Sequence, residues 1–456
     1  MTAPKTVDTI VEHAYIVTFD DAGTVLADGS IAIADDAITA VGEAADIAAA
    51  YTAAEVIDGR HRLAMPGLID AHTHIAQTMM KGLFPELQRK GKQEWPVWRR
   101  YLIPFEANLS GEDMELSMQL AAANMLAHGT TTFYDAGGPH PHHTARAALA
   151  TGMRGMIGRS TLDDSTEIPE SMRMTTDEAI EENIRLVEDY PAGGLITGSM
   201  ALRQIMNCSP ELITTIHAEA LARGAKVHSH LLEGTDEIDY AVARYGKRPI
   251  DFLIDLGVFD ETLHAAHAVY ATPWDVQKFR EYGPSVAHCR NNYNFGTPRA
   301  LEYWRAGVPI GLGTDGAATS QGMLDMFRIA SGVTMGQQYT YGPVVHELDA
   351  IAPDEALQMA TRGGAAALGM AGRIGQLTAE ARADIVLLDL DSVDASVSVT
   401  PFSYLVDGAT GHDVDTVLVD GRTVVSGGEV LTVDVDRVVS AARTRQIELV
   451  NDFNVF

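Results

Sequence analysis

The sequence predicts an α/β protein: a TIM-like (β/α)8 barrel with a small β-sandwich domain built from both chain termini. Two observations predict this fold. In the middle of the chain, eight short apolar runs alternate with helical patterns, as a parallel barrel requires. At both ends, short β-rich runs alternate with turns, and neither end alone has enough strands for a stable sheet. With 456 residues, 46% of them hydrophobic, the chain can bury a large core.

The eight apolar runs are the predicted barrel strands, because each is short and bounded by turn residues. They lie at residues 67–72, 130–135, 154–159, 194–199, 225–230, 262–267, 284–288 and 308–315. Three of the intervals begin with a helix N-cap residue and end with glycine, which are signals for the start and stop of a helix. These pairs are Ser110 and Gly129, Ser209 and Gly224, and Thr272 and Gly283. We therefore assign the barrel to residues 65–375.

The rest of the chain is predicted to form the second domain and a final helix. Strand-like runs lie at 15–20, 29–34, 384–388 and 416–421. Because neither end completes a sheet, we expect residues 1–64 and 376–436 to combine into one composite β-sandwich. Residues 437–456 have helical spacing and are expected to pack against the outside of the barrel.

One connection is unusually long, because residues 75–109 separate the first strand from its helix. Loops of this length in compact domains usually carry a function or structure of their own. Trp95, Trp98 and Phe105 would give this segment a small core. We expect it to form a lid or a wall of the substrate pocket. An insertion with no role in the site is the alternative.

Charge and composition exclude several classes of function. The net charge of −29 would repel nucleic acid and anionic membrane surfaces, so neither is an expected partner. The sequence has no basic leader followed by an apolar stretch, and no apolar run near the roughly 20 residues that span a bilayer. Two cysteines are too few for a disulfide framework. We therefore expect a cytoplasmic protein that acts on a small molecule.

His72 and His74 close the first predicted strand. Side chains two residues apart on a strand point the same way, so both imidazoles aim at one point, as in a metal site. Alone, such a pair can equally be half-buried and satisfied by hydrogen bonds. Further donors end other strands: His230 the fifth, His267 the sixth and Asp315 the eighth. Because the C-terminal ends of the strands gather on one face of a barrel, all five side chains are expected to converge.

This donor set predicts one catalytic divalent metal. Nitrogen and oxygen donors around an open position suit Zn²⁺, with Fe²⁺ or Mn²⁺ as alternatives. Such an ion lowers the pKa of its bound water toward about 7 and makes hydroxide available at neutral pH. Two-metal barrels of this type commonly add a modified lysine on the fourth strand, and no lysine lies between Lys92 and Lys226. A single metal is therefore expected.

Glu233 lies three residues after His230, just beyond the end of the fifth strand. There it can reach a substrate atom beside the metal and carry a proton from the attacking water to the leaving group. The alternative is an acid that only stabilises the N-terminus of the next helix.

The remaining histidines have other expected places. Those at positions 228 and 264 lie deeper on the fifth and sixth strands and are predicted to be core histidines. The run that contains His140, His142 and His143 follows the second strand on a loop and is not expected to bind the catalytic ion. His288 ends the seventh strand and is expected to meet the substrate.

Five segments together resemble the amidohydrolase superfamily. They are 66–74 (Pro-Gly-Leu-Ile-Asp-Ala-His-Thr-His), 230–233 (His-Leu-Leu-Glu), 265–267 (Ala-Ala-His), 313–317 (Gly-Thr-Asp-Gly-Ala) and 382–386 (Arg-Ala-Asp-Ile-Val). They span nearly the whole chain. Within the superfamily, the sequence resembles the branch that contains S-adenosylhomocysteine and adenosine-type deaminases, guanine deaminase and the triazine hydrolases.

The resemblance implies a role for each member of the cluster. The implied metal ligands are His72, His74, His230 and Asp315. By the same resemblance, Glu233 is the proton shuttle, and His267 polarises or orients the hydroxide and the forming oxyanion. Asp315 takes the proton of the water, and hydroxide adds to a ring carbon that bears an amino group. Glu233 then protonates the adjacent ring nitrogen, and ammonia leaves.

Six residues are expected to contact the substrate: Trp98, Glu106, Arg159, His288, Arg290 and Asn292. Glu106 ends a segment that resembles the one whose acid contacts ribose in nucleoside deaminases. Arg159, at the end of the third strand, could meet an acidic tail. After the seventh strand, where relatives often show His-x-Pro-x-Ser-Asn, this chain departs from the motif and carries Arg290. An arginine there could bind a carboxylate or a carbonyl-rich ring.

The expected function is therefore metal-dependent hydrolytic deamination of an N-heterocycle of the purine, nucleoside, pyrimidine, pterin or triazine type, giving the oxo product and ammonia. Alternatives with the same metal site are displacement of chloride or alkylamine from a triazine and opening of a cyclic amide. Release of free ammonia would separate them. An inactive scaffold is a third reading, against which the intact ligand set argues. Barrels of this kind usually form homodimers or larger homo-oligomers.

Overall fold

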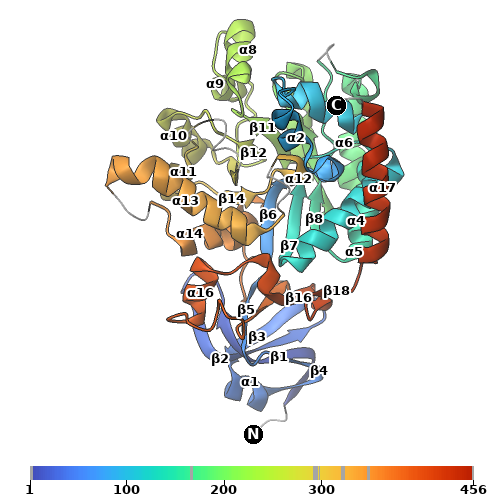
Figure 1. The fold of residues 1–456 in the computed structure, drawn as a ribbon. Helices are drawn as coiled ribbons and strands as arrows, with labels where there is room; N and C mark the ends of the chain where they lie inside the picture. The colour runs from blue at the N-terminus through green and yellow to red at the C-terminus, as the bar shows by residue number, and fades with distance from the viewer. Residues whose placement is uncertain are drawn as a thin grey trace.

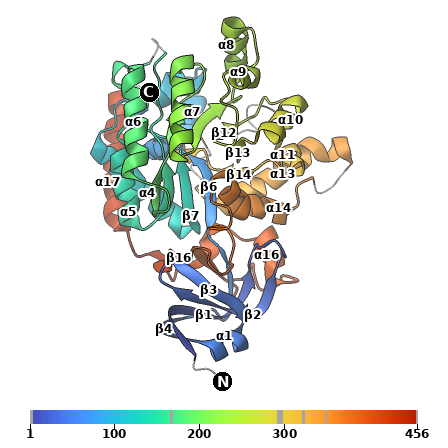
Figure 2. The same ribbon diagram turned by 180° about the vertical axis from the view of Figure 1, so that it is seen from behind.

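A computed structural model describes residues 4–164, 168–290, 296, 298–319, 324–346 and 350–453. The protein has two parts, a strand barrel surrounded by helices and a β-rich part below it (Figure 1). The N-terminus lies at the far end of the β-rich part, and the last helix runs back along the barrel (Figure 1, Figure 2). Within the described residues, we find no helix with the length and apolar character needed to cross a bilayer.

The barrel has the predicted eight strand positions, all parallel. Its strands are β6 (Leu68–Thr73), β7 (Thr130–Asp135), β8 (Arg154–Ile157), β9 (Ile196–Gly198), β10 (Met200–Leu202), β11 (Val227–Leu231), β12 (Leu263–His267), β13 (Ser285–Cys289) and β14 (Ile310–Gly313). The fourth position is divided at Ser199 into β9 and β10, which pair with β8 and β11. At the other seam, the N–H of Asp315 donates to the His72 carbonyl at 2.9 Å.

Helices cover the outside of the barrel (Figure 2). They are α4 (Gly111–Ala127), α5 (Pro141–Thr151), η3 (Glu170–Met172), α6 (Thr176–Asp189), α7 (Pro210–Arg223), α8 (Thr235–Tyr245), α9 (Pro249–Asp255), α10 (Pro273–Tyr282), α11 (Ala300–Ala306), α12 (Gly316–Thr319), α13 (Met326–Val345), α14 (Pro353–Gln358), η5 (Met359–Gly363) and α15 (Gly364–Ala367). The predicted helix starts are confirmed, because Ser110, Ser209 and Thr272 each accept a first-turn N–H. Gly224 ends α7 at φ 63°, which glycine adopts without strain.

Strands from both chain ends join in one nine-stranded sheet, which confirms the predicted composite β-sandwich. Its order is β18 (Glu429–Val430), β17 (Arg422–Ser426), β16 (Val414–Val419), β15 (Ile385–Asp389), β5 (Arg62–Pro66), β1 (Lys5–Val17), β2 (Val25–Ala34) and β3 (Ala37–Glu43), with β4 (Tyr51–Asp58) beside β1. The two ends meet where β15 pairs antiparallel with β5. Apolar side chains from both ends, among them Ile16, Ile31 and Leu387, share one core. Short helices α1 (Ala44–Ala50), α16 (Pro401–Asp407) and η6 (Gly411–Asp413) complete this part.

A buried ion cluster fastens the barrel to the composite sheet. Arg154, at the start of β8, donates to both carboxylate oxygens of Asp384 at 2.7 and 3.1 Å and also to Asp420. The side chains of Arg154 and Asp384 are nearly fully buried. A paired guanidinium and carboxylate with several hydrogen bonds offset the cost of burying both charges. The cluster fixes the end of the barrel opposite the histidines.

The long connection after β6 folds into short helices above the barrel. These are η1 (Ile75–Met80), α2 (Leu83–Arg89), η2 (Trp98–Leu102) and α3 (Ile103–Glu106). The predicted final helix is α17 (Val435–Phe453), which lies beside α4 (Figure 1). Arg445 of α17 binds Asp113 of α4 with two hydrogen bonds of 2.7 and 3.0 Å. Helix α17 therefore packs against α4 of the barrel.

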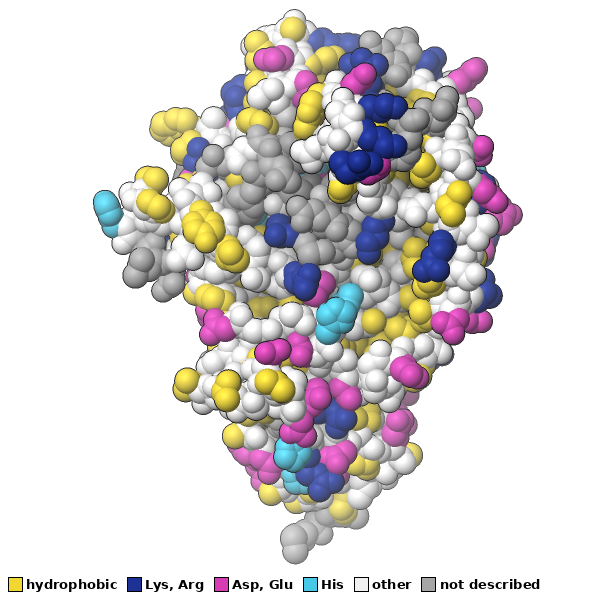
Figure 3. Space-filling model, viewed as in Figure 1, with side chains coloured by type: hydrophobic (Ala, Val, Ile, Leu, Met, Phe, Trp, Pro, Cys, Tyr) yellow, Lys and Arg dark blue, Asp and Glu magenta, His cyan; other side chains and the backbone are white. Residues whose placement is uncertain are grey.

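Helix α13 carries exposed apolar side chains far from the histidine cluster. Met335, Tyr339 and Val344 are among them, and Tyr339 is 75% exposed. Figure 3 shows hydrophobic side chains on the surface of the protruding region that contains α13. Such residues are common at protein interfaces, but the predicted homo-oligomer stays a prediction.

Candidate active site

Three histidines meet at the C-terminal face of the barrel. His72 lies in β6, His74 directly follows that strand, and His230 lies in β11. One ligand nitrogen of each lies within 4.8 Å of the others. The Nε2 atoms of His74 and His230 are 3.1 Å apart. The convergence expected from strand periodicity is therefore present, with all three side chains buried.

Asp315 and His267 complete the cluster. The Oδ1 atom of Asp315 lies 3.1 Å from His72 Nε2 and 3.4 Å from His74 Nε2. His267 Nε2 lies 4.0 Å from the same oxygen. The ring of His267 stacks on that of His230, with centroids 5.4 Å apart. Five polar side chains from four strand ends thus face one small volume.

The hydrogen bond made by His230 shows which of its two ring nitrogens carries the proton and which is free to bind a metal. Its Nδ1 lies 2.8 Å from the carbonyl oxygen of Arg203. A carbonyl only accepts, so Nδ1 carries the proton and Nε2 presents its lone pair to the cluster. A neutral imidazole held this way is the form that binds a metal. The residues present therefore fit a divalent cation.

Burial keeps His72, His74 and His230 neutral. Removal from water lowers the pKa of His72 well below its usual range, and the positive charges of neighbouring residues lower it further. The pKa values of His74 and His230 fall for the same reasons, with Arg203 the nearby cation that contributes to both. Because a protonated imidazole cannot bind a metal, this environment favours ligation.

The backbone is strained at three strand ends of the site. Leu232 has φ 53°, His267 has φ 76° and Asp315 has φ 57°. Left-handed conformations cost non-glycine residues about 1–3 kcal/mol each and persist only where surrounding contacts enforce them. The strain directs the His267 and Asp315 side chains, and the chain just before Glu233, toward the cluster.

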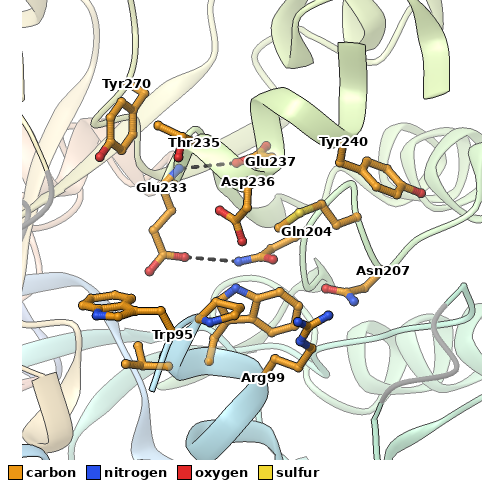
Figure 4. A pocket seen from close by; sticks show the side chains of 15 residues that line it. Trp95, Arg99, Gln204, Asn207, Glu233, Thr235, Asp236, Glu237, Tyr240 and Tyr270 are labelled. Carbon is orange, nitrogen blue, oxygen red and sulfur yellow. Dashed lines mark hydrogen bonds between the residues drawn. The ribbon is translucent and has the colours of Figure 1, made fainter. Parts of the chain in front are cut away.

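A cavity of about 620 Å³ opens beside the cluster, and Glu233 lines it. Figure 4 shows the Glu233 carboxylate pointing toward Gln204, with Trp95 below it. Gln204 Nε2 donates to Glu233 Oε2 at 3.1 Å, and Glu233 Oε1 lies 3.9 Å from His267 Nε2. Burial raises the pKa of Glu233. The cavity therefore contains an acid that can hold a proton close to the histidines.

Charged and amide side chains form a second, fully buried wall near the histidines. Gln77 donates to Glu106 Oε1 at 2.8 Å, and Arg203 lies 3.7 Å from Glu106 Oε2. Burial raises the pKa of Glu106. Among the described residues, Glu106 Oε2, Gln77 Oε1 and two guanidinium nitrogens of Arg203 have no hydrogen-bond partner. Buried polar atoms without partners are costly, and a polar group beside this wall would relieve that cost.

The residues expected to contact the substrate lie in different parts of the structure. Trp98 lines the cavity, and Glu106 belongs to the buried wall. Arg159 donates to the Gly138 carbonyl at 2.8 Å. His288 is buried, and burial lowers its pKa to about 3. Asn292 lies outside the described residues.

The side chain of Arg290 lies against helix α13, on the outside of the barrel, and not beside the histidine cluster. Its side chain lies against Gly332 of α13 so closely that a Cβ at that glycine would clash with it. It lines a separate cavity of about 430 Å³ together with Arg328 and Asp407. Contact between Arg290 and a ring bound beside His230 would require this side chain to turn around.

The other histidines occupy the places expected from the sequence. His264 bonds Ser285 Oγ and the Ala71 carbonyl, so it is a satisfied core histidine. His228 Nε2 lies 2.9 Å from His72 Nδ1, directly behind the cluster. His143 pairs with Glu115 on the outer helices.

Sequence reasoning missed Gln77, Arg203 and Gln204. Our predicted fourth strand ended at Ser199, whereas β10 continues to Leu202 beyond the break. Arg203 and Gln204 therefore stand at the true C-terminal end of the fourth strand, which is where a barrel carries its functional residues. Extending the predicted fourth strand past Ser199 would have placed both residues at its C-terminal end.

Comparisons with known proteins agree with this geometry. The amidohydrolase family model matches residues 63–424. A 5-methylthioadenosine/S-adenosylhomocysteine deaminase of Nitratidesulfovibrio vulgaris (strain DP4) is 34% identical over 456 residues, covering 98% of this chain and 99% of that protein. A 5'-deoxyadenosine deaminase of Methanosarcina barkeri is 31% identical over 453 residues, with the same coverage of 98% and 99%.

A solved structure extends the likeness to three dimensions. The crystal structure of an adenosine deaminase from Xanthomonas campestris with bound zinc has a TM-score of 0.90 and 26% identity, and the match covers 98% of this chain and 99% of that one. Because the family match spans most of the chain and the relatives align along nearly all of it, this protein belongs to the amidohydrolase family.

Proposed function

We propose that this protein is a hydrolytic deaminase that replaces an amino group on a nitrogen heterocycle by oxygen and releases ammonia. One observation carries the proposal: three neutral histidines and Asp315 converge at the edge of a cavity into which Glu233 points. The relatives named as deaminases align over nearly the whole chain, which supports the same reaction class.

A single divalent cation fits the proposed ligands His72, His74, His230 and Asp315. Zn²⁺ is favoured by this nitrogen-rich donor set, with Fe²⁺ or Mn²⁺ as alternatives. Bound there, it would supply the Lewis acidity that makes water a nucleophile at neutral pH.

The protein's own groups would move the protons. Asp315 Oδ1, within reach of two histidine nitrogens, is placed to accept a proton from water beside the cluster. Glu233 is fixed through Oε2 by Gln204, which leaves Oε1 on the side of His267. Its raised pKa suits it to hold a proton and deliver it to a ring nitrogen. His267 would orient the oxygen that adds to the ring carbon.

The overall reaction balances without a further reactant. A bond forms between the water oxygen and the amino-bearing ring carbon, and the bond from that carbon to the amino nitrogen breaks. One water proton reaches the ring nitrogen by way of Glu233 and stays there in the oxo product. The other reaches the departing amino nitrogen by way of Asp315. Ammonia and the oxo ring are the products.

Adenine-type nucleosides are the first candidate substrates, because the relatives are named for them. The cavity is large enough for a ring and its substituent, and Trp95 and Trp98 offer aromatic faces for stacking. A small heterocyclic molecule is thus the proposed partner.

The buried wall favours a second candidate, a ring that already carries a carbonyl group. The Arg203 guanidinium is an obligate donor with nitrogens that have no hydrogen-bond partner among the described residues. Glu106 Oε2 beside it can accept an N–H. Together they match the adjacent C=O and N–H of a lactam edge, which oxopurines and pterins have and adenine lacks.

A coupled ammonia assay tests the function. The purified protein, loaded with Zn²⁺, is offered adenosine, 5'-deoxyadenosine, S-adenosylhomocysteine, guanine, a pterin, cytosine and an aminotriazine. Ammonia and the oxo product in equal amounts from at least one of them support deamination. Release of chloride or alkylamine without ammonia, or ring opening of a cyclic amide, would assign the alternative chemistry instead.

A further inference from the structure

The segment that joins β11 to α8 carries Glu233 on a strained backbone. Leu232, the residue before it, has φ 53°. Leucine rarely adopts this left-handed conformation because its Cβ crowds the backbone, so the surrounding contacts must hold it. Neither residue has the conformational freedom of glycine to relieve the strain.

Two hydrogen bonds hold this turn. The N–H of Tyr270 donates to the Leu232 carbonyl at 3.0 Å. The N–H of Glu233 donates to Glu237 Oε2 at 3.3 Å, as Figure 4 shows. Both sides of the strained peptide are therefore fixed, one by the backbone after β12 and one by a side chain of α8.

Glu237 is an unusual acid for a helix N-terminus. It is only 1% exposed, although it lies in the first turn of α8, and its Oε1 has no hydrogen-bond partner among the described residues. Acids that only complement a helix dipole stay in water, where they cost little. Burial strongly raises the pKa of Glu237, and the N–H groups of Glu233 and Leu232 oppose that rise. A buried carboxyl group bonded to the backbone in this way has a specific structural target.

We propose that Glu237 is a positioning residue: its carboxyl group holds the main chain at Glu233 and so sets where the Glu233 side chain delivers its proton. This rests on the proposed function, in which Glu233 transfers the proton. Glu237 lines the cavity but is not one of the clustered histidines or proposed ligands.

The first test removes the carboxyl group. Glu237→Ala should lower kcat by a factor on the order of 10 to 100, because small displacements of a catalytic group have effects of this size. Metal content should stay at the wild-type value, since no proposed ligand is altered. Glu237→Gln keeps an amide oxygen as acceptor and should recover most of the activity. Asp239→Ala, an exposed acid of the same helix, is the matched control and should match the wild type.

The second test asks whether Glu237 acts through Glu233. If it does, the double variant Glu233→Gln with Glu237→Ala should be no slower than Glu233→Gln alone. Effects that multiply would overturn the proposal, as would a Glu237→Ala enzyme with wild-type kcat. If Glu233→Gln itself remained fully active, the proton role in the proposed function would fail instead.

Amide hydrogen exchange gives a readout that does not depend on turnover. In Glu237→Ala, the Glu233 amide should exchange on the order of tenfold faster, because its acceptor is gone, while β11 keeps its protection. The exchange of Asp239→Ala should be unchanged at Glu233. Unaltered exchange in Glu237→Ala would show that the carboxyl group does not hold this peptide.

Discussion

Asp70 accepts two hydrogen bonds from Thr314, one from its backbone N–H at 3.0 Å and one from its hydroxyl at 2.6 Å. The two residues lie in β6 and just after β14, the first and last strands of the barrel. Thr314 directly precedes Asp315, and Asp70 lies two residues before His72; both Asp315 and His72 are proposed metal ligands. The contact therefore closes the barrel and sets the separation of ligands that are far apart in the sequence.

Asp70→Asn should lower the free energy of unfolding by about 1–2 kcal/mol, because the amide nitrogen cannot accept the Thr314 hydroxyl and a buried hydrogen bond is lost. Urea unfolding followed by fluorescence measures this. Asp239→Asn, on an exposed helix face, should stay within about 0.5 kcal/mol of the wild type. Equal stability of all three proteins would refute the closing role.

Glu233→Gln should reduce kcat by a factor on the order of 10² or more, because the amide cannot carry the proton. The bound metal should remain, since Glu233 is not among the proposed ligands. Steady-state ammonia release and metal analysis together measure both quantities. The exposed Glu211→Gln serves as a control with wild-type rates; a Glu233→Gln enzyme at wild-type rate contradicts the proton shuttle.

Chelation should abolish ammonia release and lower the melting temperature, because a cation that binds only the folded state stabilises it by mass action. Re-addition of one equivalent of Zn²⁺ should restore both. Elemental analysis and thermal scans of the same samples provide the measurement. A requirement for two equivalents would contradict the single-metal site.

Arg203→Met tests the buried wall. If a carbonyl-bearing ring is the substrate, kcat/KM should fall on the order of 10², since a site built to hydrogen-bond loses its donor. Metal content should be unchanged, because Arg203 meets His230 through its backbone carbonyl, which the substitution leaves in place. Unchanged kcat/KM for such a ring would exclude the guanidinium as its partner.

The link between α17 and α4 should depend on pH. Hydrogen bonds from Arg445 and Ser110 hold the pKa of the Asp113 carboxyl below its ordinary value, against the opposing effect of burial. A lowered folded-state pKa stabilises the fold above the ordinary value of about 3.9, and that gain is lost as pH falls through the folded pKa. Asp113→Asn should therefore be less stable by about 1 kcal/mol at pH 7. Melting curves should show the difference shrinking as the pH falls below about 4, toward the lowered pKa of Asp113; a constant difference would contradict the ion pair.

Much of the fold could be predicted because it follows from local sequence patterns, such as short apolar runs and helix caps. Strand periodicity located the barrel strands, and the strand ends brought His72, His74, His230 and Asp315 together. The break at Ser199 hid Arg203, because a bend between two short strands leaves no periodic signal. The direction of Arg290 was equally hidden: it depends on the space left by Gly332, on a helix remote in sequence.

Strand β5 lies between β1 and β15 in the sheet. The N-terminal strands are synthesised first, so their sheet is complete only after residues 385–389, which form β15, have been made. Until then β5 presents an open edge, which can pair with another chain. Pairing across such a sequence distance is slow. The newly made chain is therefore exposed to aggregation through β5 until the C-terminal strands pair with it.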